Sequence, residues 1–253
     1  MRNERCYEKE VMIMDKELLY EGKAKHIYKT DVDDVLLIRY KDNITAFNGL
    51  KKDKMVGKGR LNNEISCLIF EKIQAAGIDS HFIKRVSETE QLVRSVKIIS
   101  LEVVVHNVVA GSLAKRLGLT EGTKLDAPFV DFFYKDDTLN DPLVTDAHIK
   151  LLNIASQQQI TELTVKAFEV NTVLKKLFSD INVQLVDFKL EFGIDKEGNI
   201  LLADEISPDT CRLWDLTTSE KLDKDVYRRD IGNILEVYEL VLSRLLQKKN
   251  ILK

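Results

Sequence analysis

Three charged residues alternate with large apolar residues in VQLVDFKLEF, at positions 183–192. In an extended chain Asp187, Lys189 and Glu191 leave on one face, because successive side chains of a strand point to opposite sides. Large apolar residues such as Phe188 leave on the other face and can anchor it in a core. The pattern raises the question of why so apolar a strand carries an acid, a base and an acid in a row.

A turn signal, DKEGN, separates this strand from the apolar run that ends at Asp204, so the two runs are expected to form a hairpin. A two- or four-residue loop places Glu191 opposite Asp204, with Cβ atoms roughly 5 Å apart. A three-residue loop with a bulge places Ala203 there instead. Two facing carboxylates repel unless a cation neutralises them, and Mg²⁺ takes such ligands together with phosphate oxygens. The alternative is a solvated face on which Lys189 bridges the acids.

The loop after this hairpin, DEISPDTCRLWD at 204–215, gathers Asp209, Arg212 and the chain's single tryptophan. An arginine in such a loop can grip a phosphate or carboxylate through two parallel hydrogen bonds. We therefore interpret the loop as a substrate clamp. The alternative is a structural loop that an ion pair between Arg212 and Asp215 holds in place.

Two further segments contain residues that could contact phosphate groups. In YEGKAKHIY, Lys23 and Lys25 share one face of a strand that follows Gly22, and their ammonium groups could meet nucleotide phosphates. The spacing is not that of a Walker motif, and an ordinary basic turn is the alternative. In AGSLAKRLG, Gly111 and Ser112 could open a helix whose free amides bind an anion. The alternative there is a plain serine N-cap.

The elements that position these residues are a mixture of strands and helices. Alternating or continuous apolar patterns predict strands at 17–30, 34–42, 80–87, 90–96 and 97–109. Apolar residues at three- and four-residue spacing predict helices at about 62–76, 156–178 and 226–248. Ser156 and Gln159 form a capping box before the second helix, and the polar stretch 48–60 is expected to be a loop. An α+β protein in two lobes is the expected class.

Composition limits the function classes. The 253 residues are 44% hydrophobic and 31% charged, a balance typical of a soluble globular protein of one or two domains. A net charge of −3, without a basic block that contains aromatic residues, gives no reason to expect nucleic acid. Three widely spaced cysteines favour a reducing cytoplasm over a disulfide framework. No apolar run approaches a membrane span, and residues 1–13 are expected to be a disordered extension.

Taken in order, the segments resemble the SAICAR synthetase family of purine biosynthesis over nearly everything from Leu18 to Leu245. The matching motifs are YEGKAKHIYKT, TAFNG, GKGRLNNEIS, SETEQLV, LEVVVHNVVAGSLAKRLG, LVDFKLEFG and DEISPDTCRLWD. The resemblance implies a two-lobed, ATP-grasp-like α+β fold. Its N-terminal, kinase-like lobe would be 14–98 and its C-terminal, ATP-grasp-like lobe 99–253, with ATP in the crevice between them.

The resemblance also implies an activity. The family joins L-aspartate to the carboxylate of carboxyaminoimidazole ribonucleotide (CAIR) and gives SAICAR, ADP and phosphate. A carboxylate is unreactive toward amines, so ATP first converts it into an acyl phosphate that the amine of aspartate displaces. ATP and Mg²⁺ are the implied cofactors, and CAIR and L-aspartate the implied substrates, without nucleic acid or membrane partners. A homodimer is compatible with this resemblance.

Residues at the nucleotide end follow from the same resemblance. Glu191 and Asp204 match positions that hold Mg²⁺, and Lys23 and Lys25 match positions that bind ATP phosphates. A transferring phosphoryl group needs its charge neutralised from several sides, which such a set provides. Lys189, on the same strand face as Glu191, is expected to meet the nucleotide or the substrate carboxylate and is assigned a catalytic role.

At the other end of the implied site, Ser112 and Arg212 match positions that grip the 5′-phosphate of CAIR. Asp209 matches a position near the imidazole ring of CAIR and is likewise assigned a catalytic role. Lys135 and Asp141, in YKDDTLNDP, match positions that border the site. The residues that bind L-aspartate cannot be located from spacing.

One departure from the family pattern matters, and Ser100, where a proline is usual, is a milder one. His106, in VVVHNVVAGS, stands where the family has an arginine that helps to bind the phosphate of CAIR. An active ligase is the leading hypothesis, because the other matched residues are retained. A nucleotide-binding relative that has lost catalysis is the second hypothesis, which only His106 favours. A sibling ligase with a different amine is the third.

Overall fold

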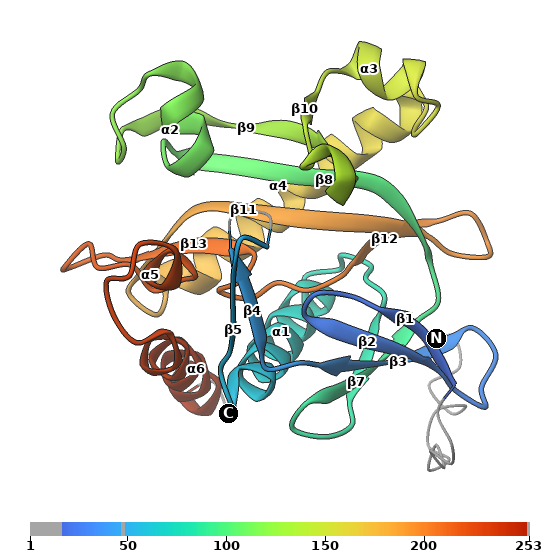
Figure 1. Ribbon diagram of the computed structural model, residues 1–253, viewed down its shortest axis with the longest axis horizontal. Coiled ribbons are helices and arrows are strands. Elements are labelled where there is room, and N and C mark those ends of the chain that lie inside the picture. Colours follow the sequence, from blue (N-terminus) through green and yellow to red (C-terminus); the bar gives the residue numbers. More distant parts are fainter. Residues whose placement is uncertain (1–16, 47–48, 252–253) are drawn as a thin grey trace.

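The computed structural model describes residues 17–46 and 49–251 and shows a mixed α/β structure (Figure 1). A first, five-stranded antiparallel sheet has the order β1-β2-β3-β7-β6. Its strands are β1 (Leu18–Glu21), β2 (Lys25–Lys29), β3 (Val35–Tyr40), β7 (Glu90–Arg94) and β6 (Phe82–Arg85). A separate hairpin of β4 (Asn43–Ala46) and β5 (Lys51–Lys54) precedes the first helix.

A second, six-stranded sheet curls through the middle of the molecule. It has the order β10-β9-β8-β11-β12, with β13 paired to the first half of β11, and all its pairings are antiparallel. The strands are β8 (Lys97–Val108), β9 (Lys124–Tyr134), β10 (Leu143–Val144), β11 (Val183–Ile194), β12 (Ile200–Ala203) and β13 (Cys211–Asp215). Strand β11 is therefore a central strand of this sheet.

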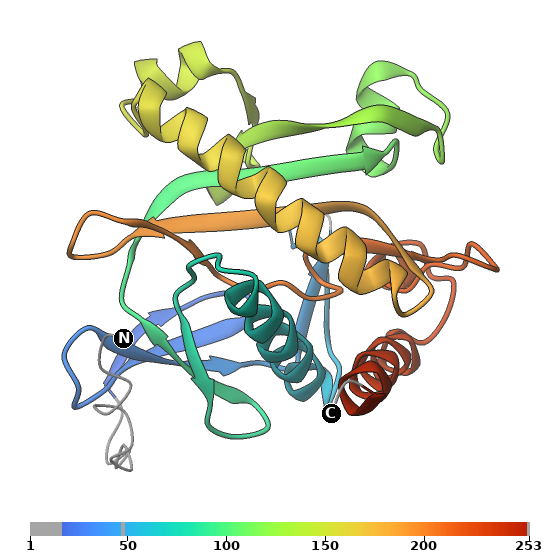
Figure 2. The ribbon, with the colours of Figure 1, turned by 180° about the vertical axis from the view of Figure 1, so that it is seen from behind.

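Helix α4 crosses one face of the second sheet, which Figure 2 shows from that side. Helix α1 packs against α6 and α4, below the sheet in this view. The helical elements are α1 (Lys58–Ala75), α2 (Gly111–Leu117), the 3₁₀ turn η2 (Asp137–Leu139), α3 (Asp146–Leu151), α4 (Gln157–Ser179), α5 (Asp225–Arg228) and α6 (Ile234–Ile251).

Two helices begin or end where the sequence predicts. The Ser156 hydroxyl accepts the backbone N–H of Gln159 at 3.2 Å, and the Gln159 side chain accepts that of Ser156 at 2.9 Å, so the capping box at the start of α4 is confirmed. Helix α1 ends at Ala75, and Gly77 follows with φ +84°. Glycine takes this left-handed conformation at low cost, which explains why the helix ends there.

The alternation in β11 separates the two faces of the second sheet. Phe188, Leu190 and Phe192 are buried in the main core, which also contains the inward face of α4. This core continues without interruption to α1 and to Phe82 of the first sheet. The side chains of Asp187, Lys189 and Glu191 lie on the opposite face of the sheet, away from α4.

Three local predictions were wrong. The segment 17–30 forms two strands, β1 and β2, because the chain reverses at Gly22, whose N–H donates to the Lys25 carbonyl at 2.8 Å. Residues 51–54 form β5 rather than a loop, although they are all polar. The closing helix is interrupted after Arg228, and the chain passes through Asp230 at φ +54° before α6 begins.

The predicted register of the late hairpin was also wrong. Glu191 lies opposite Ala203, not Asp204. The loop has three residues between Asp195 and Asn199, and its last residue, Gly198, has φ +88°. This is the three-residue alternative, in which a type I turn is followed by a left-handed residue.

The predicted extension at 1–13 lies outside the described residues. Within the described ranges, no helix combines the length and the apolar character that crossing a bilayer requires. A parallel bridge between Ser80 and Leu202 and the burial of Phe82 in the main core link the two sheets, while the buried apolar residues of β3 and β7 form two smaller clusters.

Candidate active site

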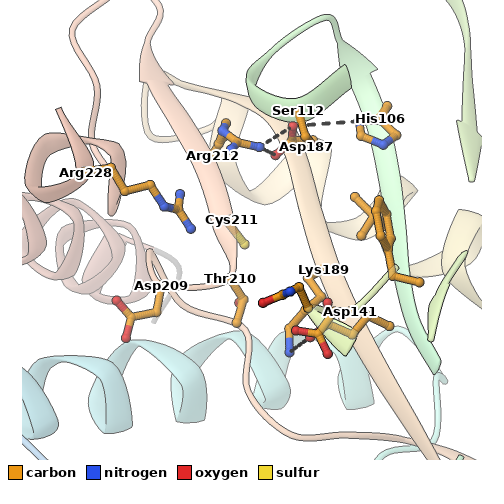
Figure 3. Close-up of a pocket in the computed structure, with 14 residues that line it drawn as sticks. His106, Ser112, Asp141, Asp187, Lys189, Asp209, Thr210, Cys211, Arg212 and Arg228 are labelled. Carbon is orange, nitrogen blue, oxygen red and sulfur yellow. Dashed lines mark hydrogen bonds and ion pairs between the residues drawn. The ribbon is translucent and has the colours of Figure 1, made fainter. Parts of the chain in front are cut away.

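The polar face of the second sheet forms the floor of a cavity of about 390 Å³ (Figure 3). Three cross-strand pairs of β11 and β8 occupy this face: Asp187 with His106, Lys189 with Val104, and Glu191 with Glu102. The cavity brings together six of the predicted site residues: His106, Ser112, Asp141, Lys189, Asp209 and Arg212. Lys23, Lys25, Lys135, Glu191 and Asp204 do not line it, although all but Lys23 connect to it through ion pairs.

Lys189 lies at the centre of a cluster of carboxylates. Its ammonium group contacts Glu191, and it lies 3.1 Å from Glu102 and 3.6 Å from the Asp204 carboxylate. Burial alone would lower the pKa of Lys189, but Glu191, Asp204 and Glu102 together raise it well above its ordinary value. Lys189 is therefore a fixed positive charge that bridges the acids, but on a largely buried face rather than a solvated one, since Glu191 is 3% exposed.

Lys25 connects the first sheet to this cluster. Its ammonium group contacts Asp204 and lies 3.1 Å from Glu205. Burial would lower the pKa of Lys25, but the two carboxylates raise it above its ordinary value. Lys135 similarly lies 2.7 Å from Glu191. Lys23 does not share this environment, because it makes an exposed pair with Asp137 at 2.6 Å.

Glu191 and Asp204 fit a magnesium site although they are not cross-strand partners. Both contact the ammonium group of Lys189, so their oxygens converge on one cation. Among the described residues no set of three or more His, Cys, Asp and Glu side chains is arranged to hold a metal. Mg²⁺ ordinarily takes one or two carboxylates and completes its shell with water and substrate phosphates. The donor set thus fits a metal that arrives with a nucleotide.

Arg212 occupies the opposite end of the cavity. One terminal nitrogen lies 3.1 and 2.9 Å from the two oxygens of Asp187, and Nε lies 3.2 Å from Asp225. The alternative pair with Asp215 is wrong, because Asp215 binds Arg244 at 2.7 Å. The guanidinium packs on the backbone of Gly111 so closely that a Cβ atom there would overlap it.

Asp209 is held by groups that sequence patterns did not reveal. Its carboxylate contacts the buried ammonium of Lys58 and accepts hydrogen bonds from Asn62 at 2.8 Å and Tyr238 at 2.6 Å. Burial would raise the pKa of Asp209, but Lys58, with Lys224 and the Tyr238 hydrogen bond, lowers it well below its ordinary value. Asp209 is therefore an ionised carboxylate in a fixed orientation.

The remaining predicted residues border the cavity. Ser112 lines it and is not a cap, since the N-cap of α2 is Ala110 and makes no side-chain cap bond. Asp141 has φ +46°, and its carboxylate accepts the backbone N–H of Asp136 at 2.9 Å. Figure 3 shows Ser112 and His106 close to the end with Arg212, and Asp141 close to Lys189.

Sequence patterns missed several charged residues of the site. Glu102 lines the cavity and lies 3.1 Å from the ammonium group of Lys189. Arg228 of α5 lines the cavity, and its guanidinium lies 2.7 Å from Asp225, which also binds Arg212. Lys58 is fully buried against Asp209. Lys58 lies within the motif GKGRLNNEIS, which was recognised only as part of a resemblance. For Asp225 and Arg228 no local signal separated them from an ordinary helix surface.

Comparisons with known proteins give a consistent result. A sequence model described as SAICAR synthetase matches residues 18–245. Phosphoribosylaminoimidazole-succinocarboxamide synthase of Lysinibacillus sphaericus (strain C3-41) is 61% identical over 229 residues, which are 90% of this chain and 97% of the relative. The enzyme of the same name from Bacillus mycoides (strain KBAB4) is 60% identical over 229 residues, 90% of this chain and 96% of the relative.

Solved structures agree with the sequence comparison. The chain resembles the phosphoribosylaminoimidazole-succinocarboxamide synthase of Ehrlichia chaffeensis with a TM-score of 0.88 and 43% identity, over 90% of this chain and 98% of that one. It resembles a SAICAR synthetase (Type-2) in complex with ADP with a TM-score of 0.88 and 47% identity, over 90% and 97% of the two chains. The chain therefore belongs to the SAICAR synthetase family.

Proposed function

We propose that the protein is an ATP-dependent ligase that joins L-aspartate to the carboxylate of CAIR through an acyl phosphate and releases SAICAR, ADP and phosphate. One observation carries the proposal beyond family membership. A single cavity has a lysine–carboxylate cluster at one end and paired arginines at the other. Such a cavity suits a substrate with an anionic phosphate at one end and a carboxylate to be activated at the other.

The nucleotide belongs, in this proposal, beside the cluster around Lys189. A relative was solved in complex with ADP, which supports nucleotide binding by this chain. Glu191 and Asp204 would hold Mg²⁺, which supplies charge neutralisation to the phosphate oxygens. Lys25 is placed at Asp204 and can turn to a phosphate when a metal takes the carboxylate. Lys23 is proposed to contribute from the exposed edge of the same turn.

CAIR belongs along the floor of the cavity. Arg212 and Ser112 would bind its 5′-phosphate, since a guanidinium and a hydroxyl both donate to phosphate oxygens. Lys189 then lies where a fixed positive charge can hold the carboxylate that is to be activated. Asp209, ionised and rigidly held, would accept hydrogen bonds from the imidazole end of CAIR. Asp141 and Lys135 would close the side of the cavity near Lys189.

The two sheets correspond, in this proposal, to two lobes, and the expected boundary at 98/99 falls just inside β8, the first strand of the second sheet. The nucleotide would lie in an ATP-grasp-like crevice where Lys25 of the first sheet meets Asp204 after β12. The wide spacing of the cysteines supports a cytoplasmic location. The proposed partners are small molecules, and the protein would act as a monomer or a homodimer.

The test uses purified protein with CAIR, L-aspartate and MgATP, and follows SAICAR by absorbance and ADP by a coupled assay. We expect both products to form at equal rates and to need all three substrates. ADP binding without turnover would identify a relative that has lost catalysis. Turnover with another amine, and none with L-aspartate, would identify a sibling ligase.

A further inference from the structure

His106 is a buried histidine between two carboxylates. The residue is 2% exposed, Nε2 lies 3.3 Å from Asp131 of β9, and Nδ1 lies 3.7 Å from Asp187 of β11. Its ring packs on Phe129, with a centroid distance of 5.0 Å. Among the described residues neither ring nitrogen has a partner in good hydrogen-bond geometry. Figure 3 shows the ring beside the end of the cavity that holds Arg212.

Each of these carboxylates also binds an arginine. Asp187 holds Arg212 of β13, and Asp131 contacts Arg116 of α2. The charges that face His106 from the packed elements are thus acidic on β9 and β11, with the arginines of α2 and β13 behind them. The result is a row of alternating charges, Arg116–Asp131–His106–Asp187–Arg212, whose last three members line the cavity.

The row favours a protonated imidazole. A neutral imidazole has one N–H and one lone pair, so one of its nitrogens would direct a lone pair at a carboxylate. An imidazolium ion has two N–H groups and can donate one to each side. Burial would lower the pKa of His106, but Asp131 and Asp187 raise it above its ordinary value.

We propose that His106 is a positioning residue whose proton, held between Asp131 and Asp187, sets the affinity of Arg212 for a phosphate monoester. The protonated ring offsets the charge of Asp187, which leaves the guanidinium of Arg212 free to turn toward an anion. When the proton is lost, both carboxylates keep their full charge beside the cavity and repel a phosphate. His106 borders the cavity, but it is only 2% exposed, so it acts chiefly through Asp187 rather than by contact with the ligand. The identity of that monoester as CAIR rests on the proposed function.

The first measurement is the pKa of His106 by NMR of its ring protons, assigned with His106→Gln. We expect a pKa above about 6.5, the value of an unperturbed histidine. Asp131→Asn should lower this pKa, because one of the two carboxylates loses its charge. Arg116→Gln should raise it, because Asp131 is then no longer shared with a guanidinium. Each variant has its own expected direction of pKa shift, so either one alone tests the inference if the other folds poorly.

The second measurement is the affinity for ribose 5-phosphate, a phosphate monoester, as a function of pH. We expect affinity to fall up to about tenfold as pH rises through the pKa of His106, with the midpoint displaced in Asp131→Asn. His106→Arg keeps its charge and should lose this step, while it retains the titration of the phosphate itself. His106→Gln cannot carry the charge, so at every pH it should show the weak affinity that the wild type shows at high pH.

Two results would overturn the inference. One is a pKa of His106 at or below about 6.5 that neither Asp131→Asn nor Arg116→Gln shifts. The other is an affinity profile for ribose 5-phosphate that is the same in wild type and Asp131→Asn. Both arms are independent of turnover, so failure to make SAICAR would contradict the proposed function and leave this test intact.

Discussion

At the scale of single residues, the carboxylate of Asp209 is balanced by the fold itself. Lys58, Asn62 and Tyr238 all bind it, and Lys58 is fully buried. The folded state holds the pKa of Asp209 below its unfolded value. The stabilisation is therefore fully present above the unfolded pKa of about 3.9 and is lost only as pH falls through the lower folded pKa.

Lys58→Met should destabilise the protein by about 3–5 kcal/mol near neutral pH, because it leaves a buried carboxylate without its ammonium partner. The variant raises the pKa of Asp209, so the deficit should be smaller at about pH 5 than at about pH 8. Urea unfolding at both pH values measures this deficit in the free energy of unfolding.

Lys58→Met with Asp209→Asn should recover most of the loss, since no charge is left unpaired. Lys249→Met, which breaks the surface pair with Glu71, should cost less than about 1 kcal/mol. A deficit as small as that of Lys249→Met would show that the buried pair contributes little.

Asp204→Asn should weaken both magnesium-dependent turnover and stability. Loss of one charge-assisted contact is expected to lower activity about ten- to a hundredfold. Stability should fall by about 1–3 kcal/mol without nucleotide, because among the described residues Lys25 keeps only Glu205 as a carboxylate partner. Removal of one acid does not relieve repulsion here, because Lys25 and Lys189 already lie against the carboxylate of Asp204.

Asp34→Asn is the matched control for this substitution. Asp34 has φ +60°, as Asp204 does, and contacts Lys196 at an exposed position. It shares the backbone conformation and an ion pair, but it lies in the exposed turn between β2 and β3, whereas Asp204 lies 3.6 Å from Lys189 of the cavity. Turnover at saturating and limiting Mg²⁺, with thermal unfolding of both variants, gives the comparison. Equal behaviour of the two variants would remove Asp204 from the metal site.

At the scale of elements, the short helix α2 has a glycine at each end, and the two glycines have different surroundings. Gly111 has φ +53° and lies against Arg212, whereas Gly118 has φ +66° and has open space where a side chain would begin. Both positions favour glycine for the same backbone reason. Only the first also makes room for a side chain of the cavity.

Gly111→Ala should therefore raise the KM for CAIR about ten- to a hundredfold, because the new methyl group displaces the guanidinium of Arg212. Gly118→Ala should leave this KM unchanged. Both variants should lose about 1–2 kcal/mol of stability from the left-handed backbone. Gly111→Ala should lose more, because the methyl group also disturbs the ion pairs of Arg212. Steady-state kinetics with thermal unfolding separate the two effects. A KM that is equally raised in both would mean that α2 as a whole, not the space at Gly111, governs binding.

Sequence patterns predicted the elements better than their pairing. The capping box of α4 and the alternation of β11 are local, so they could be read from neighbouring residues. The register of β11 and β12 depends on one residue of loop length, and the glycine in DKEGN is compatible with several turns. Strand β5 was missed because its residues are polar and its pairing with β4 is tertiary information.

At the scale of the whole molecule, the site depends on contacts between distant parts of the chain. Lys58 and Asp209 are 151 residues apart, and Lys25 and Asp204 are 179 apart. Spacing along the chain cannot reveal such pairs. The resemblance placed Lys25, Asp204 and Asp209 in one site but gave no partner for Asp209. What sequence could not supply is the burial that turns these residues into fixed charges.

The same long-range contacts bear on how the molecule unfolds. One continuous core contains Cys67 of α1 and Cys211 of β13, which lie on opposite sides of the proposed lobe boundary at 98/99. Two lobes with separate cores would unfold independently, whereas a shared core couples them. We therefore expect a single cooperative transition for the described part of the chain.

Cys67 and Cys211 provide a native probe on each side of that boundary. Both are 3% exposed, and burial raises the pKa of the Cys67 thiol to about 12, so each should react with a thiol reagent only after unfolding. Labelling in increasing urea, with each cysteine quantified by mass spectrometry, reports a free energy of opening at each site. We expect the two free energies to agree within about 0.5 kcal/mol and to match global unfolding followed by the fluorescence of Trp214. A Cys67 that reacts at clearly lower urea than Cys211 would show that the first sheet and α1 open on their own, and that the shared core does not couple the two parts.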